Sequence, residues 1–131
     1  MSPVERERFE ELVRRAMETL PPEIAERIDN VDVEVQDWPD PRQLASARVP
    51  RGSTLLGLYQ GIPLTKRTTA YNLVPPDRIV IFQGPLERGA PSDAGLVDRV
   101  RDVVVHEVAH HFGISDERLR EIEAARRSAR T

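Results

Sequence analysis

The order of the predicted elements indicates an α+β fold. Apolar residues recur at helical spacing near both ends of the chain, whereas short alternating or β-branched segments occupy the middle. Because helices and strands form separate runs instead of alternating, we expect a sheet packed against helices rather than a series of βαβ units. The 131 residues suit one hydrophobic core, so we predict a single domain spanning residues 1–131.

Two helices and one strand are predicted at the N-terminal end. Residues 3–20 place apolar side chains on one helical face, and Ser2 is suited to cap this helix. The Pro21-Pro22 pair ends it and can begin a short second helix that runs to Ile28. Residues 31–35 alternate valine with acidic residues, which predicts a half-buried strand.

The middle of the chain predicts two strands separated by loops. Residues 37–54 are rich in Pro, Arg and Ser without a clear period, so we expect a long loop. Residues 55–64 resemble a strand in which Gly57 indicates a bulge or a close approach by another part of the chain. Residues 78–82 form a compact β-branched strand, and residues 83–91 are expected to form another loop.

A long helix and a shorter one complete the predicted fold. Ser92 is suited to cap a helix whose apolar residues continue at helical spacing to Phe112. Gly113 then ends it, because glycine adopts the left-handed conformation at little cost. A last helix is expected from Ser115, as its N-cap, to about Ser128.

Composition excludes several classes of function. The net charge is −3 and the pI is about 5.7, which argues against a general nucleic-acid-binding protein. There is no cysteine, so disulfides, thiolate catalysis and cysteine-ligated zinc are excluded. The charged N-terminus has no apolar segment typical of a signal peptide, and no apolar run is long enough to span a bilayer. We therefore expect a cytoplasmic protein that does not bind membranes.

The segment from His106 to His110 carries the strongest indication of chemistry. Its pattern is H-E-x-x-H within a predicted helix, and residues four apart lie on the same helical face. His106 and His110 can therefore direct two imidazoles at one zinc ion, which binds imidazole nitrogen well. Glu107 follows the first histidine and can take a proton from the water that zinc activates. The alternative is that both are ordinary exposed histidines.

A third ligand is expected beyond the glycine that ends the helix. Asp116 lies three residues after Gly113, at a turn that can bring its carboxylate back toward the two histidines. The whole pattern, H-E-x-x-H-x-x-G-x-x-D, resembles the metzincin pattern with Asp in place of the third His. Two alternatives stay open. Asp116 could have no role beyond a favourable interaction with the dipole of the last helix. Glu117 or Glu121 could then replace it as a ligand.

Three neighbouring residues have predicted supporting roles. His111 faces about 100° away from His110 around the helix, so we expect it to be structural or to lie at the rim of the site. Asp102 precedes His106 by one turn and is either an orienting partner for its ring or a solvated surface acid. Tyr59 is either a core residue or a group that stabilises the oxyanion of the reaction.

Three segments together resemble the small bacterial zincin-like metallopeptidase family, also described as a minimal metalloprotease domain. They are residues 55–64, residues 76–87 and residues 106–117, of which the last is the most specific. The resemblance implies a compact zincin-like α+β fold with a short mixed sheet beside the active-site helix. It also implies zinc held by His106, His110 and Asp116, with Glu107 as the catalytic residue.

The sequence departs from the two large H-E-x-x-H classes. Metzincins have a methionine turn below the metal, but here the only methionines, Met1 and Met17, lie far upstream. The other class uses a distant downstream glutamate, whereas only about fifteen residues follow Asp116. A metzincin in the strict sense is therefore not expected.

The predicted function is zinc-dependent hydrolysis of peptide bonds in a peptide or protein substrate. The strand at residues 55–60 is expected to be an edge that pairs with an extended peptide. The competing hypothesis is an interaction module in which zinc only stabilises a small domain. Glu107 favours catalysis, because a structural site has no use for a carboxylate beside the metal. An amidase with a non-peptide substrate would use the same chemistry, and the oligomeric state stays open.

Overall fold

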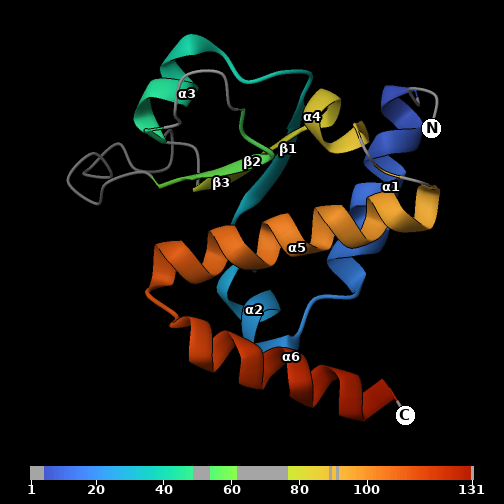
Figure 1. The fold of residues 1–131 in the computed structure, drawn as a ribbon, viewed down its shortest axis with the longest axis vertical. Coiled ribbons are helices and arrows are strands. Elements are labelled where there is room, and N and C mark those ends of the chain that lie inside the picture. The colour runs from blue at the N-terminus through green and yellow to red at the C-terminus, as the bar shows by residue number, and fades with distance from the viewer. Residues whose placement is uncertain (1–4, 49–53, 62–76, 89, 91, 131) are drawn as a thin grey trace.

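The computed structural model describes residues 5–48, 54–61, 77–88, 90 and 92–130, and Figure 1 shows its ribbon. The helices and strands follow in the order α1 (Arg6–Glu18), α2 (Pro22–Arg27), β1 (Asp32–Gln36), α3 (Pro41–Ser46), β2 (Gly57–Gln60), β3 (Arg78–Phe82), α4 (Gln83–Glu87), α5 (Asp93–Phe112) and α6 (Asp116–Arg130). This combination of helices and a small mixed sheet confirms the predicted α+β class.

The sheet has β3 at its centre and β2 at one edge. The strand order is β1-β3-β2, with β1 parallel and β2 antiparallel to β3. The central strand is apolar from Ile79 to Phe82, and all four of these side chains are buried. A strand covered on both faces is expected to be continuously apolar. The mixed sheet implied by the family resemblance is therefore present.

Helix α5 is the central element of the fold. In Figure 1 it lies between the sheet on one side and α2 and α6 on the other. It contributes six buried residues to the core, which also takes residues from α1, α2 and β3. Adjacent Val104 and Val105 are both fully buried, because the helix is covered on more than one side. A helix held in this way gives side chains on its remaining face a fixed position.

Both ends of α5 are as the sequence predicts. The Ser92 hydroxyl accepts a hydrogen bond from the Gly95 amide at 3.1 Å, which caps the N-terminus. Gly113 has φ 69° and ψ 28°, the left-handed conformation that ends a helix. The next helix is capped in turn by Ser115, whose hydroxyl accepts from the Arg118 amide at 3.1 Å.

Two predicted loops contain short helices, so those predictions were wrong. Within residues 37–54, Asp40 and Gln43 form a reciprocal capping box that starts α3, with Pro41 at its first position. Within residues 83–91, the Gly84 amide donates to the Asp37 carbonyl at 2.9 Å as α4 begins. Both helices have six residues or fewer, too short to show a helical period in the sequence.

Other predicted boundaries differ slightly. Helix α1 begins at Arg6, while Ser2 and Pro3 lie outside the described residues. Strand β2 covers four residues of the predicted 55–64, and residues 62–64 are also outside the described part. Among the described residues, no helix is both long and apolar enough to cross a membrane.

Candidate active site

His106, Glu107 and His110 line one cavity on the exposed side of α5. The cavity has a volume of about 440 Å³, and its opposite wall is formed by residues 54–57, which lead into β2. The two histidines are exposed and Glu107 is half-buried. The structure thus brings the three residues of the predicted motif to one cleft, as their helical spacing requires.

The ring of His106 is held by the backbone of its own helix. Its Nδ1 lies 2.7 Å from the carbonyl oxygen of Asp102, one turn earlier. A carbonyl only accepts hydrogen bonds, so Nδ1 is the donor here, and in the neutral ring Nε2 keeps its lone pair. Residue 102 therefore orients the histidine through its backbone, while its carboxylate is exposed and pairs with Arg101 at 2.9 Å. An oriented imidazole with a lone pair on Nε2 is the form that binds metals.

The carboxyl group of Glu107 lies between the helix and strand β2. Burial raises the pKa of Glu107 above its ordinary value, and three groups oppose this by favouring the charged form. These are a hydrogen bond from the Tyr59 backbone amide and the imidazoles of His110 and His106. A carboxylate that is partly desolvated and fixed by one backbone donor is suited to accept a proton from a bound water.

The register of the sheet explains why the Tyr59 amide is available to Glu107. The Leu56 carbonyl accepts from the Phe82 amide at 3.1 Å, so residue 56 directs its backbone groups at β3. In an antiparallel pair, successive residues direct their backbone N–H and C=O groups alternately toward the partner strand and away from it. Gly57 and Tyr59 therefore direct these groups away from β3, to the outer edge of β2. The outer edge of β2 therefore faces the active-site cleft.

Close packing of β2 on α5 depends on Gly57. A Cβ atom at this position would overlap Val103 Cγ1 and would lie 3.3 Å from the Val80 carbonyl oxygen. The predicted close approach is thus confirmed, and the contact is with a side chain of the active-site helix.

His111 belongs to an aromatic cluster beside the cleft. Its ring stacks on Tyr59 with centroids 3.8 Å apart and meets Phe112 edge-on at 4.9 Å. The Tyr59 hydroxyl donates to a carboxylate oxygen of Asp77 at 2.8 Å. His111 is exposed and packs beside the cleft, which fits both of its predicted roles, structural and at the rim. The contacts favour the packing role for Tyr59, whose hydroxyl already has a partner.

Asp116 lies in the first turn of α6 and shares a second groove with His106. This groove has a volume of about 330 Å³, and Glu123, two turns further along α6, also lines it. Glu123 is a candidate metal ligand that the sequence did not lead us to predict. Its spacing of seven residues from Asp116, which places both on one face of a helix, could have indicated it. Of the two predicted substitutes, Glu117 is exposed, and Glu121 pairs with Arg118 at 2.9 Å.

The donor set fits zinc in its chemistry, since two imidazoles and one carboxylate are common zinc ligands. In the described part of the chain, however, no group of three His, Asp or Glu side chains is close enough to hold a metal ion. His106 lines both the cleft with His110 and the groove with Asp116. The structure therefore brings together His106, Glu107 and His110, and places Asp116 in a separate groove that His106 also lines.

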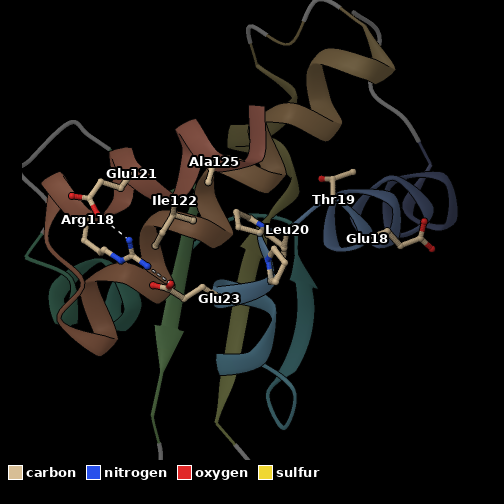
Figure 2. A pocket seen from close by; sticks show the side chains of 10 residues that line it. Glu18, Thr19, Leu20, Glu23, Arg118, Glu121, Ile122 and Ala125 are labelled. Carbon is tan, nitrogen blue, oxygen red and sulfur yellow. Dashed lines mark hydrogen bonds and ion pairs between the residues drawn. The ribbon is translucent and has the colours of Figure 1, made fainter. Parts of the chain in front are cut away.

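A larger cavity lies elsewhere, and none of the described residues that line it belongs to the H-E-x-x-H motif. Its volume is about 630 Å³, and it lies where the end of α1 and the start of α2 meet α6. Figure 2 shows Arg118 at its rim, directed toward both Glu23 and Glu121. No histidine is among the described residues that line it.

A helix that presents H-E-x-x-H beside the edge strand of a small mixed sheet defines the zinc-peptidase class of site. A model of the family described as zincin-like metallopeptidase matches residues 28–126, and the chain belongs to this family. This confirms the family inferred from the sequence. No curated protein matches the chain.

Proposed function

We propose that this zincin-like metallopeptidase hydrolyses peptide bonds, with His106, His110 and Asp116 as zinc ligands and Glu107 as general base. The observation that carries the proposal is the cleft in which His106, Glu107 and His110 meet, with the His106 ring already oriented. The family supports a metallopeptidase in general, and this cleft supports the particular residues.

Zinc held by His106, His110 and Asp116 would polarise the scissile carbonyl and make the attacking water more acidic. Glu107 accepts the proton of that water and passes it to the amine that leaves. The Tyr59 amide holds the carboxylate in place, while the Asp102 carbonyl keeps the His106 ring in its orientation. Each of these roles uses a group that the fold fixes before substrate binds.

The substrate peptide is proposed to bind along the outer edge of β2. In the described part of the chain, no strand pairs with its outer edge, and Gly57 directs its backbone groups there and lines the cleft. A substrate added as a further strand would place its backbone along the histidines without depending on its side chains. A protein or peptide substrate fits this arrangement better than a small amide, which would use little of the edge.

Asp116 is the proposed third ligand because it shares a groove with His106 and is exposed at the start of α6. Its carboxylate would have to move for the three side chains to meet at one metal ion. Glu123 shares the same groove and is the alternative that the structure adds. Measuring zinc content by mass spectrometry in Asp116→Ala and Glu123→Ala distinguishes them. We expect zinc to be lost only from the first. Unchanged zinc in Asp116→Ala would refute this ligand.

Glu107→Gln tests the catalytic role. Removing a general base typically lowers the rate by about 10²- to 10⁴-fold. We therefore expect hydrolysis of a quenched fluorescent peptide library to fall by this factor while zinc content stays at the wild-type level. Glu26→Gln is a matched control on the exposed surface of α2 and should retain both properties.

The rival function is an interaction module that uses zinc only for stability. It predicts that the zinc-loaded wild type cleaves no member of the library, and that Glu107→Gln differs from it in nothing but stability. Equal cleavage by wild type and Glu107→Gln would contradict the proposed mechanism directly.

A further inference from the structure

We infer that Arg99 is a specificity-determining residue that binds a carboxylate of the peptide on the C-terminal side of the scissile bond. The inference rests on the proposed peptidase function and names the kind of substrate that the cleft accepts. Arg99 lines the same cavity as His106, Glu107 and His110. It lies seven residues before His106, which places it two turns away on the same face of α5.

The guanidinium group is held in place but not neutralised. Arg99 is half-buried, and its Nε donates to the Leu86 carbonyl at 3.0 Å. Among the described residues it forms no ion pair, so its two terminal nitrogens have no anionic partner there. Because one hydrogen bond already fixes the plane of the group, less entropy is lost when a carboxylate binds end-on.

The other charged groups of the cleft do not neutralise the positive charge of Arg99. Asp102 also lines the cavity, but its carboxylate is exposed and pairs with Arg101. Glu107 lies further along the helix and receives the Tyr59 amide. The cavity is otherwise lined in part by apolar side chains, those of Leu55, Leu56 and Val103. In such surroundings an arginine–carboxylate contact is stronger than in open water.

The relative direction of β2 and α5 decides which end of a peptide reaches Arg99. Gly57 packs on Val103, the Tyr59 amide reaches Glu107, and a Cβ at Gly61 would lie 3.1 Å from His111 Cε1. Strand and helix therefore run the same way. A peptide paired antiparallel with β2 runs the opposite way, with its C-terminal residues toward Arg99.

The spacing gives the position of the carboxylate. Seven helical residues span about 10 Å, and an extended peptide covers about 3.3 Å per residue. The carboxylate should therefore lie about three residues beyond the scissile bond. It can belong to an Asp or Glu side chain or be the terminal carboxylate of a short product, and both present the same group to Arg99.

Binding and cleavage are both measured, so that this inference and the peptidase function fail separately. The probes are fluorescein-labelled peptides with Glu or Gln at the second or third position after the cleaved bond. A second pair ends at that position with a free carboxylate or a carboxamide. Affinities are measured by fluorescence anisotropy on the zinc-loaded Glu107→Gln protein, and kcat/KM on the protein with Glu107.

We expect the carboxylate peptide to be preferred by about 10- to 100-fold over its amide, as for other hydrogen bonds to charged groups. Arg99→Gln should reduce this ratio to about one. Arg118→Gln removes the same charge from an exposed site on α6, outside the cleft, and should keep the wild-type ratio. Comparing the two pairs of peptides shows whether a side chain or the chain terminus supplies the carboxylate.

The outcomes separate the two proposals. The same carboxylate preference before and after the Arg99→Gln change, or no binding of any peptide, would overturn the inference. Selective binding without cleavage by the protein that retains Glu107 would overturn the peptidase function and leave the Arg99 site standing. Thermal unfolding of Arg99→Gln checks that loss of the Leu86 contact has not unfolded the chain.

Discussion

The contact between β2 and α5 offers a direct test of how the fold builds the cleft. Gly57→Ala adds one methyl group at a position where its carbon would overlap Val103 Cγ1. Carbon atoms pack favourably at about 3.5–4.0 Å, so strand and helix would have to separate by roughly 1 Å. The Val80 carbonyl oxygen, 3.3 Å away, limits movement toward β3.

Overpacking of this kind typically costs about 1–3 kcal/mol, which should lower the Tm by several degrees in a domain of this size. The same shift would draw the Tyr59 amide away from Glu107. We therefore expect Gly57→Ala to lose both stability and peptidase activity. Thermal unfolding and cleavage of the peptide library measure the two effects on the same sample.

A double-mutant cycle isolates the contact. Val103→Ala removes the atom that clashes, and the remaining Val103 Cβ would lie 3.9 Å from the new methyl, an ordinary contact. The double variant should thus be more stable than the sum of the single changes predicts, by about 1–2 kcal/mol. Additive effects, or a Gly57→Ala protein as stable and active as the wild type, would refute this account of the cleft.

Three further predictions concern the site and its surroundings. Gly113→Ala should destabilise the protein by about 1–2 kcal/mol in chemical denaturation, because φ is 69° at this position, where a Cβ is unfavourable. A steric clash does not contribute, since no atom lies within 4 Å of the added carbon. Gly113→Asn should cost less, because asparagine tolerates the left-handed conformation better than alanine. Asp40→Ala should cost about 1 kcal/mol through loss of the α3 capping box, with no change in zinc content. Chelation should lower the Tm, and zinc at about 100 times its Kd should restore about 2.7 kcal/mol of stability in calorimetry; an unchanged Tm would contradict zinc binding.

The sequence predicted best those elements whose hydrophobic pattern repeats over many residues or whose ends are marked by distinct capping residues. Helix α5 shows both, since its apolar residues repeat over twenty positions between Ser92 and Gly113. The H-E-x-x-H spacing also placed His106 and His110 correctly on one face, because helical geometry is local. Strand β3 was predicted with its observed bounds, as its β-branched run is buried on both faces.

The short helices α3 and α4 were missed because neither is long enough to show a repeating hydrophobic pattern. Helix α3 depends on the capping box between Asp40 and Gln43, and α4 begins beside a backbone contact with Asp37. The capping signal was present in the sequence, but a segment rich in Pro and Arg had no period to support it. The contact with Asp37 joins two segments that are distant along the chain.

The sequence by itself determined the α+β class, the two histidines with their glutamate, and the family to which the chain belongs. Tertiary structure decided what surrounds them. Packing placed the edge of β2 over α5, supplied the Tyr59 amide to Glu107 and brought Arg99 into the cleft. It also placed Asp116 and Glu123 together in a second groove that His106 lines. Helical spacing is a local property that a sequence records, whereas contacts between α5, α6 and β2 depend on how distant segments pack.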